Sequence, residues 1–456
     1  YGNLIRLING GTAPNTNSPM VSADYNFPSN TTPADVQLFP AAYYLDIDFD
    51  LKKDLLVAPN ANNVSENENS VWFYKNLATN QAPVFVYQDH DWLQGDMIDH
   101  GLGSVPLVYD VNQDGLKDLL VANYFAYKPV LNKEARIAYY QNIGTATAPQ
   151  LILVDQDFLN LASSNLGLRL LPAMGDLNGD TKPDIILGRE NGQIAFYFNA
   201  STGSTPNFQL QSNAILDANN QIIQVPLYAA PQLFDFNKDG LLDLIVGHKG
   251  GTLYYYKNTG TSSTPVFTLE TSVLGGVNVQ SNGPDGFAVP HLFDFQDTTY
   301  LIVGALDGRL HFYDSISTDP LADFHERSSD FLGLSAQIGA YAAAVIGNLD
   351  NDSHLELIVG QDAGGLFLLE NEPGSDLHIS EITVQPLQVF PNPTKGKIAI
   401  KGLQGSSSGA IYNLLGQKVL VFPFISAQEM LDITALELGT YILKLDNGQS
   451  ALFMKH

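Results

Sequence analysis

The chain has 456 residues, enough for more than one domain, and its 45% hydrophobic content is typical of a folded protein. It has 22 Lys and Arg residues against 48 Asp and Glu residues, and the net charge of −26 disfavours nucleic acid and anionic membrane surfaces as partners. Zero cysteines exclude disulfides, thiolate metal sites and cysteine nucleophiles. The sequence starts at Tyr1 without a signal peptide, so we expect it to be processed or cut from a longer one.

A repeated unit accounts for most of the chain. Its copies start at residues 46, 110, 176, 235, 294 and 348, which are 54 to 66 residues apart. Each copy has a short apolar strand, an acidic loop, a second apolar strand, an alternating third strand and a turn before a fourth. Four short strands separated by turns predict an antiparallel sheet. Repetition of such a sheet predicts an all-β chain that forms a β-propeller.

The two ends of this region bear on the blade count. Residues 2–9 and 11–19 match the third and fourth strands of a unit whose start is absent, and residues 341–371 supply only three strands. Six loop-bearing units and this half unit predict seven blades, one of them incomplete or closed by pairing of the chain ends. Six blades, with an N-terminal strand closing the ring, are the alternative.

The acidic loops have the oxygen spacing of a calcium site. Side-chain oxygens occupy loop positions 1, 3, 5 and 9, and position 7 can add a carbonyl, which suits the six to eight oxygen ligands of Ca²⁺. Crowded carboxylates repel one another unless a cation is present. The alternative is a set of Asx turns without an ion. The candidate ligand sets, for up to five structural Ca²⁺ ions, are Asp46, Asp48, Asp50 and Asp54; Asp110, Asn112, Asp114 and Asp118; Asp176, Asn178, Asp180 and Asp184; Asp235, Asn237, Asp239 and Asp243; and Asn348, Asp350, Asp352 and Glu356.

The loops are not equally suited to a metal. Gly115 and Gly240 occupy position 6, where a left-handed backbone eases the turn, but Leu51, Thr181 and Ser353 replace glycine in the other loops. The copy at Asp294 is two residues shorter and loses the spacing, so we expect a blade there without a metal.

This motif resembles the FG-GAP/VCBS repeat family over residues 1–375. The resemblance implies an integrin-like propeller with calcium in the acidic loops. Propellers of this family serve as adhesins, ligand binders and accessory domains, so the resemblance implies the fold and the metal better than the function.

Two segments are candidates for function within the repeats. The stretch from Asp89 to His100 combines two histidines with four aspartates, a composition compatible with a metal or acid–base site. Shifted by 66 residues it matches 155–166, where Gln and Leu replace His90 and His100, so we interpret it as a feature of the repeat. The insertion 123–136 adds aromatic and basic residues and is either a binding loop or an ordinary surface insertion.

The repeats end near residue 375, and residues 376–386 read as a linker. Residues 387–456 then predict a small Ig-like β-sandwich of alternating strands. This segment resembles the type A C-terminal sorting domain of the Bacteroidota type IX secretion system. The matching blocks are Pro391-Asn-Pro-Thr-x-Gly396, Asn413-x-x-Gly-Gln-x-Val419, Leu436-x-x-Gly-x-Tyr441 and the lysine near the C-terminus.

The resemblance implies export through the periplasm of a Gram-negative bacterium to the outer cell surface or the medium. It also implies partners for residues 387–456: an outer-membrane shuttle barrel with its translocon, a sortase-like protease, and surface lipopolysaccharide. We expect a calcium-binding propeller that acts as an adhesin or as a recognition module for an unknown glycan or protein, and not as an enzyme. The alternative is a secreted enzyme or polymer-processing factor with a pocket near His90 and His100.

Overall fold

A computed structural model describes most of the chain. The described residues are 3–11, 18–36, 39–60, 69–95, 97–128, 132–203, 205–281, 283–352, 354–370, 388–401, 407–413, 418–425, 430–445 and 450–456. The chain divides into two compact units, Tyr1–Gly374 and Ser375–His456. The predicted linker, residues 376–386, lies outside the described residues. Over the described ranges, no helix combines the length and the apolar character needed to cross a membrane.

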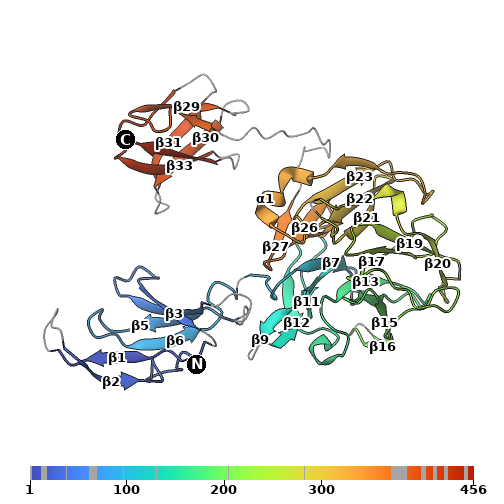
Figure 1. Cartoon of the computed structure of the whole chain (residues 1–456), viewed down its shortest axis with the longest axis horizontal. Helices are drawn as coiled ribbons and strands as arrows, with labels where there is room; N and C mark the ends of the chain where they lie inside the picture. The colour runs from blue at the N-terminus through green and yellow to red at the C-terminus, as the bar shows by residue number, and fades with distance from the viewer. Residues whose placement is uncertain are drawn as a thin grey trace. The chain divides into compact units, whose positions relative to one another are not determined.

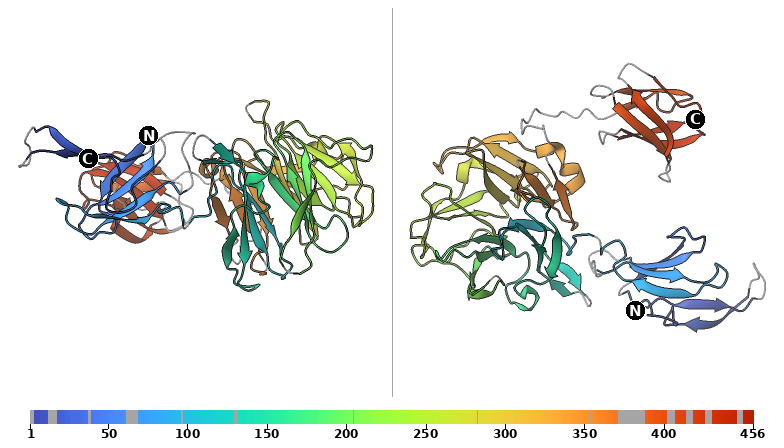
Figure 2. Two further views of the ribbon diagram at one scale, coloured as in Figure 1. Left: turned by 90° about the horizontal axis from the view of Figure 1, so that it is seen from below. Right: turned by 180° about the vertical axis from the view of Figure 1, so that it is seen from behind.

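Five antiparallel sheets of the first unit form a closed ring (Figures 1 and 2). They are β7 (Val105–Tyr109), β8 (Asp118–Ala122), β11 (Ile137–Asn142) and β12 (Leu151–Asp155); β13 (Leu171–Gly175), β14 (Asp184–Gly188), β15 (Ile194–Asn199) and β16 (Phe208–Ser212); β17 (Ala230–Phe234), β18 (Asp243–Gly247), β19 (Leu253–Asn258) and β20 (Phe267–Thr271); β21 (Val289–Phe295), β22 (Thr298–Gly304), β23 (Leu310–Asp314) and β24 (His325–Ser328); and β25 (Ala343–Gly347), β26 (Glu356–Gly360) and β27 (Leu366–Leu369). The prediction of a β-propeller is confirmed.

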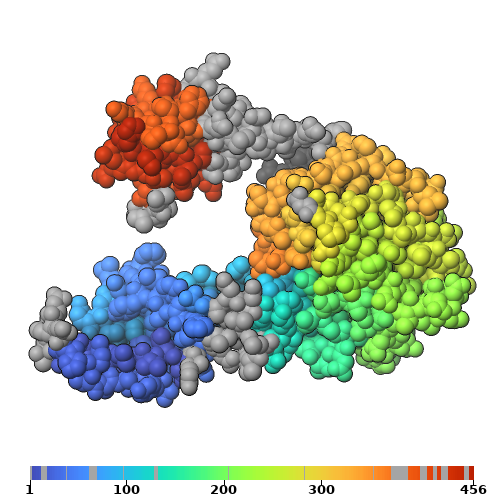
Figure 3. Space-filling view, in the orientation of Figure 1, coloured from blue at the N-terminus to red at the C-terminus, as the bar shows by residue number. Residues whose placement is uncertain are grey.

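The first strand of each sheet, here called the inner strand, packs against the inner strands of both neighbouring sheets. The second strand is buried along its whole length in β8, β14, β18 and β26. Such strands are covered on both faces, which explains their continuous apolar sequences. The fourth strands, such as β20, expose part of their residues at the rim. In the space-filling view the sheets, coloured cyan to orange, form one continuous body (Figure 3).

Five equivalent backbone hydrogen bonds join each sheet to the next. The donor is always the residue two positions before an inner strand, and the acceptor lies just beyond the second strand of the preceding sheet. The donor–acceptor pairs are Arg169–Tyr124, Tyr228–Glu190, Phe287–Lys249, Tyr341–Leu306 and Gly103–Asp362, with N···O distances of 2.9 to 3.1 Å. The last pair joins the fifth sheet to the first. The ring therefore has five blades, and the predicted count of seven, or six, is wrong.

The difference arises from a sheet that repeats the unit without entering the ring. This sheet contains β3 (Pro40–Leu45), β4 (Asp54–Pro59), β5 (Trp72–Asn76) and β6 (Phe85–Asp89). Its β3 corresponds to the inner strands, yet Tyr43 and Leu45 are 51% and 50% exposed. A separate pair, β1 (Arg6–Asn9) and β2 (Met20–Asp24), precedes it. A core including Val36, Val57 and Phe85 ties this sheet to the segment before it.

A short hairpin and several short helical turns lie outside the sheets of the ring. Strands β9 (Ala126–Lys128) and β10 (Asn132–Glu134) form a hairpin beside the first blade. Short helical turns are η2 (Leu161–Ser163), η3 (Leu274–Gly276), η4 (Phe331–Gly333) and α1 (Ser335–Ile338).

The second unit is a β-sandwich, as predicted. One sheet contains β28 (Gln388–Phe390), β29 (Lys397–Lys401) and β32 (Met430–Asp432), and the other contains β31 (Lys418–Ile425), β30 (Ser407–Asn413), β33 (Gly439–Leu445) and β34 (Ser450–Lys455). Ile398, Ile411, Leu443 and Phe453 belong to the core between them.

Candidate functional site

The acidic loops share one backbone geometry. In four of them the position-1 aspartate accepts the N–H of the residue at position 6: Asp46 from Leu51, Asp110 from Gly115, Asp176 from Thr181 and Asp235 from Gly240, at 2.8 to 3.0 Å. Every one of these position-6 residues has a left-handed backbone, with φ between 68° and 88°. Leu51 and Thr181 thus adopt the turn that glycine adopts elsewhere. Ser353 lies outside the described residues.

Position 9 of each loop is a buried carboxylate that braces the sheet. Asp118 is fully buried and accepts N–H groups from Val111 at 3.0 Å and Asn142 at 2.8 Å, and the Tyr139 hydroxyl at 3.1 Å. Asp243 likewise accepts the Tyr255 hydroxyl at 2.9 Å. In the third loop Phe196 occupies the position of these tyrosines, so Asp184 has no such donor.

This burial affects the protonation of the position-9 residues. It raises the pKa of Asp118, Asp243 and Glu356, and it raises the pKa of Asp184 to about 6. The backbone N–H donors oppose the rise but do not cancel it. A nearby cation would favour the ionised form of each carboxylate.

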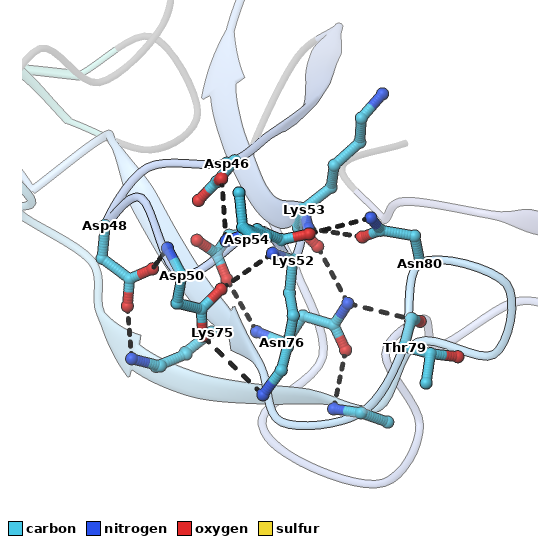
Figure 4. Close-up of polar contacts among 12 residues, drawn as sticks. Asp46, Asp48, Asp50, Lys52, Lys53, Asp54, Lys75, Asn76, Thr79 and Asn80 are labelled. Atoms are coloured by element: carbon cyan, nitrogen blue, oxygen red, sulfur yellow. Dashed lines mark hydrogen bonds and ion pairs between the residues drawn. The ribbon is translucent and has the colours of Figure 1, made fainter.

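The first loop gathers three carboxylates (Figure 4). Ligand oxygens of Asp46, Asp48 and Asp50 lie within 4.8 Å of one another, whereas Asp54 is not in this group and accepts N–H groups from Ile47 and Asn76. The Asp46 Oδ1 atom is buried and has no hydrogen-bond partner among the described residues. A buried acceptor of this kind fits a missing ligand.

The fifth loop forms the second carboxylate group. Asp350, Asp352 and Glu356 have ligand oxygens within 4.8 Å of one another, and the buried Asn348 Oδ1 has no partner in the described part of the chain. The other loops carry asparagine at position 3, and in the second loop Asn112 Nδ2 donates to Asp114 at 2.8 Å. Asn178 and Asn237 each keep a buried Nδ2 without a partner among the residues described. Rotating the amide of the position-3 asparagine by half a turn would place its oxygen where the nitrogen now lies, and this oxygen could bind a cation. The donor sets of these loops therefore fit calcium.

The shorter copy at Asp294 forms a different turn. Strands β21 and β22 stay paired up to Phe295 and Thr298, and Gln296 and Asp297 make a tight left-handed turn. Asp294 binds the Thr299 hydroxyl at 2.6 Å and Lys238 at 2.7 Å. The expected blade is present without the nine-residue loop.

The two histidines of the 89–100 segment lie outside the strands and contact tyrosines of different sheets. His90 is exposed and contacts the Tyr87 hydroxyl at 3.0 Å in the β3–β6 sheet. His100 is buried and contacts the Tyr140 hydroxyl of the first blade at 2.7 Å. Asp89 and Asp91 lie beside His90, and their mutual hydrogen bond lowers the pKa of Asp89 and raises that of Asp91.

The predicted binding loop, residues 123–136, contains the β9–β10 hairpin. The Lys133 Nζ atom lies 4.1 Å from the Phe125 ring centroid and 5.3 Å from that of Tyr127. The hairpin leaves the ring where the second strand of the first blade ends, whereas the acidic loops leave it where the inner strands end. The hairpin and the acidic loops therefore lie at opposite ends of the ring.

An arginine surrounded by aromatic rings was missed by the sequence reasoning. Its signal is positional: Arg169, Tyr228, Phe287 and Tyr341 each stand two residues before an inner strand. Each also stands seven residues before the start of its repeat copy, at 176, 235, 294 or 348, so aligning the copies on their starts reveals the recurrence.

Comparisons with known proteins locate the clearest relationship in the second unit. Residues 388–456 match the family described as the secretion system C-terminal sorting domain. No curated protein matches the chain.

Several solved structures resemble the chain distantly. One is a lectin of Agrocybe aegerita that recognises non-reducing terminal N-acetylglucosamine, at 14% identity over 74% of this chain and 81% of the lectin, with a TM-score of 0.31. A second is PorZ of Porphyromonas gingivalis, a surface component of its type IX secretion system, at 14% identity over 91% of this chain and 58% of PorZ, with a TM-score of 0.28. A third is a sialidase mutant of Trypanosoma rangeli, at 10% identity over 75% of this chain and 56% of the sialidase, with a TM-score of 0.28.

The sorting motifs are joined within the second unit. Thr394 N–H donates to the Met454 carbonyl at 2.8 Å, and Asn392 accepts the Met454 N–H at 2.9 Å, so the Pro391–Gly396 block is held against the last strand. The buried Lys455 donates to the carbonyls of Thr434, at 2.8 Å, and Leu436. Residues 388–456 are thus a secretion system C-terminal sorting domain, and the chain is a type IX secretion cargo, exported to the cell surface or secreted.

Proposed function

We propose that this cargo is a calcium-stabilised propeller that acts outside the cell as an adhesin or as a recognition module for a glycan or protein. The observation that carries the metal assignment is the pair of buried oxygens, on Asp46 and Asn348, that have no partner in the described part of the chain and stand at position 1 of their loops. Both loops also gather three carboxylates. Ca²⁺ would be structural there, because the loops connect strands and bring no other reactive group together.

The β9–β10 hairpin supports recognition at the end of the ring away from the acidic loops. Phe125 is half-buried and Lys133 is exposed, and their stacking presents an aromatic and cationic surface on an otherwise acidic protein. Aromatic residues and cations that stack on them are common at binding surfaces.

Calcium titration of the full chain tests the metal assignment. We expect the melting temperature to rise with CaCl₂ over EGTA, since a ligand that binds only the folded state stabilises it. The Asp46→Asn variant should bind one ion fewer by calorimetry. Asp297→Asn, in the turn of the shortened copy, is the matched control and should bind as many ions as the parent. A melting temperature that is the same in CaCl₂ and EGTA contradicts the calcium assignment.

Glycan and protein arrays probed with the full chain test recognition. Binding should weaken in Lys133→Met and persist in Lys53→Met, whose Nζ atom lies 5.6 Å from the Tyr44 ring in the β3–β6 sheet. Equal binding by the two variants would remove the hairpin from the binding surface. An absence of binding to any spot in CaCl₂ would argue against a recognition role.

One observation favours an enzyme as the second candidate. The hydrogen bond between Asp89 and Asp91 separates their pKa values beside His90, a pattern found where one carboxyl is the acid and the other the base. Hydrolysis of polysaccharides or peptides that is lost in His90→Gln, with the melting temperature unchanged, would support this candidate over recognition.

The resemblance of the tail supports more specific partners. We propose that residues 387–456 are bound by the outer-membrane shuttle barrel and its translocon, and that a sortase-like protease removes them before release or attachment to lipopolysaccharide. Co-purification of the full chain with the barrel, compared with a chain ending at residue 386, tests this. Equal recovery of both chains would contradict it.

A further inference from the structure

Five equivalent residues meet at one end of the ring axis. We call Gly103, Arg169, Tyr228, Phe287 and Tyr341 the axial positions. All have a left-handed backbone, with φ from 49° to 72°. Four of them are not glycine, and this conformation is uncommon for bulky residues. Such strain often accompanies function.

The axial side chains form a cage around the Arg169 guanidinium. Its Cζ atom lies 4.1 Å from the ring centroid of Tyr124, 4.8 Å from that of Tyr228, 5.1 Å from that of Tyr341 and 5.7 Å from that of Phe287. Tyr124 fills the fifth place, because a side chain at Gly103 would overlap its ring.

The rings also contact one another in sequence. The centroid distances are 4.9 Å between Tyr228 and Phe287, 5.0 Å between Phe287 and Tyr341, and 5.6 Å between Tyr341 and Tyr124. Arg169 completes the circle between Tyr124 and Tyr228. The cage therefore receives residues from every blade.

One nitrogen of the guanidinium lacks a hydrogen-bond acceptor among the residues that the structure describes. Its Nη1 atom is buried and has no partner among the described residues, and no ion pair within 4.0 Å joins Arg169 to the described acidic groups. Aromatic faces attract the charge but do not satisfy five N–H donors. An acceptor supplied by a ligand would do so.

Acidic groups lie close to this cage. The backbone carbonyls of Asp362 and Glu190 accept the N–H groups of Gly103 and Tyr228. Burial raises the pKa of Asp362, and the charge of Arg169 opposes that rise. The cage therefore combines aromatic faces and one cationic donor, and the Asp362 carboxylate lies close enough for the Arg169 charge to act on it.

A sugar ring fits this combination. Each hydroxyl both donates and accepts hydrogen bonds, so adjacent hydroxyls can bridge Arg169 and Asp362, while the apolar C–H faces of the ring pack on Tyr228 and Tyr341. An acidic sugar would place its charge near Asp362 on a chain whose net charge is −26. We propose that the axial cage is a binding site for a neutral pyranose unit of a saccharide.

This inference rests on the proposed recognition function and names its ligand class. The axial cage and the β9–β10 hairpin lie at the same end of the ring. The calcium loops lie at the other, beyond an inner strand of roughly 17 Å at about 3.3 Å per residue. Calcium and sugar binding can therefore be tested separately.

The experiment uses the full chain in CaCl₂ and a panel of methyl glycosides: mannoside, galactoside, glucoside, N-acetylglucosaminide and glucuronide. Saturation-transfer NMR and titration should detect at least one neutral glycoside. Arg169→Met should weaken it by about 10- to 100-fold, the loss expected for hydrogen bonds to a charged group. Asp362→Asn should weaken it by about 10-fold. Arg309→Met, which removes an exposed arginine paired only weakly with Asp307 at 3.6 Å, is the matched control and should bind like the parent.

The outcomes separate this inference from the function on which it rests. Binding that both cage variants retain would overturn the axial site and leave recognition elsewhere intact. Preference for the glucuronide would overturn the neutral ligand class. If no glycoside binds while binding on the protein array is preserved, the cage has only a structural role at the ring axis. If Arg169→Met does not fold, the Asp362→Asn result decides.

Discussion

Replacing Gly360 with alanine is expected to weaken the ring where its fifth sheet meets its first. A Cβ at this residue would lie 2.6 Å from the Ser104 carbonyl carbon, nearer still to its oxygen, and 3.1 Å from Pro106 Cδ. These atoms belong to the backbone and a proline ring, so no rotamer change relieves the overlap, and β26 or β7 must shift. Such overpacking costs about 1–3 kcal/mol. The reduced entropy of the unfolded alanine chain offsets only about 0.4–1 kcal/mol.

The net loss should therefore be about 1–2 kcal/mol. For a ring of roughly 270 residues, with an unfolding entropy of about 2.1 cal/mol/K per residue, this lowers the melting temperature by about 2–4 °C. Calorimetry of the full chain measures it. Gly203→Ala is the control, because a Cβ there meets nothing within 4 Å. A Gly360→Ala melting temperature equal to that of the control would refute direct closure between β26 and β7.

Three further measurements probe single contacts. Burial lowers the pKa of His291 to about 4, below the ordinary 6.5, so its stabilisation is present above pH 6.5 and is lost as the pH falls toward 4. Urea titrations at pH 7.5 and 4.5 should show about 2.5 kcal/mol less pH dependence of the unfolding free energy in His291→Gln than in the parent, and an equal pH dependence in the two proteins would contradict this role of His291. In EGTA, Tyr255→Phe should lower the free energy of unfolding by about 2 kcal/mol, because it removes a hydrogen-bond donor to Asp243, whereas Phe196→Tyr should raise it by supplying a donor to Asp184. A change of the unfolding free energy in the same direction in both variants would contradict this role of the tyrosines. Lys455→Met should speed amide exchange in the sorting domain, because it leaves the Thr434 and Leu436 carbonyls unpaired, and the exposed Lys444→Met should not; equal exchange in the two variants would show that Lys455 is dispensable.

The regular parts of the repeats were predictable because they depend on local chemistry. The alternation of acidic loop and apolar strand predicted β18 and its equivalents, since a strand covered on both faces must be apolar throughout. We expected the loops with Leu51 and Thr181 at position 6 to be less suited to a metal than those with glycine. Both residues nevertheless adopt the same turn, because hydrogen bonds to the position-1 aspartate hold them in the left-handed region.

Ring size was not predictable because it depends on contacts between distant repeats. The sheet formed by β3–β6 reads like a blade. Its Phe39 stands seven residues before Asp46, the same distance that separates each axial position from its own loop, and has a left-handed backbone, yet it is 71% exposed. Whether a repeat joins the ring depends on a neighbour that offers the next inner strand. The Arg169 cage was missed for the same reason, since its consecutive members are 45 to 59 residues apart in the sequence and meet only after the ring closes.

The way the ring closes has a consequence for maturation. Its final bonds, from Gly103 and Ser104 to Asp362 and Gln361, use no residue beyond Leu369 and none from the strands before β7. A protease that cuts after the last blade would therefore remove the sorting domain without breaking any of the hydrogen bonds that close the ring. The residues that close the propeller and the residues that direct export are thus separate parts of the chain, so the exported propeller can lose residues 388–456 and stay folded.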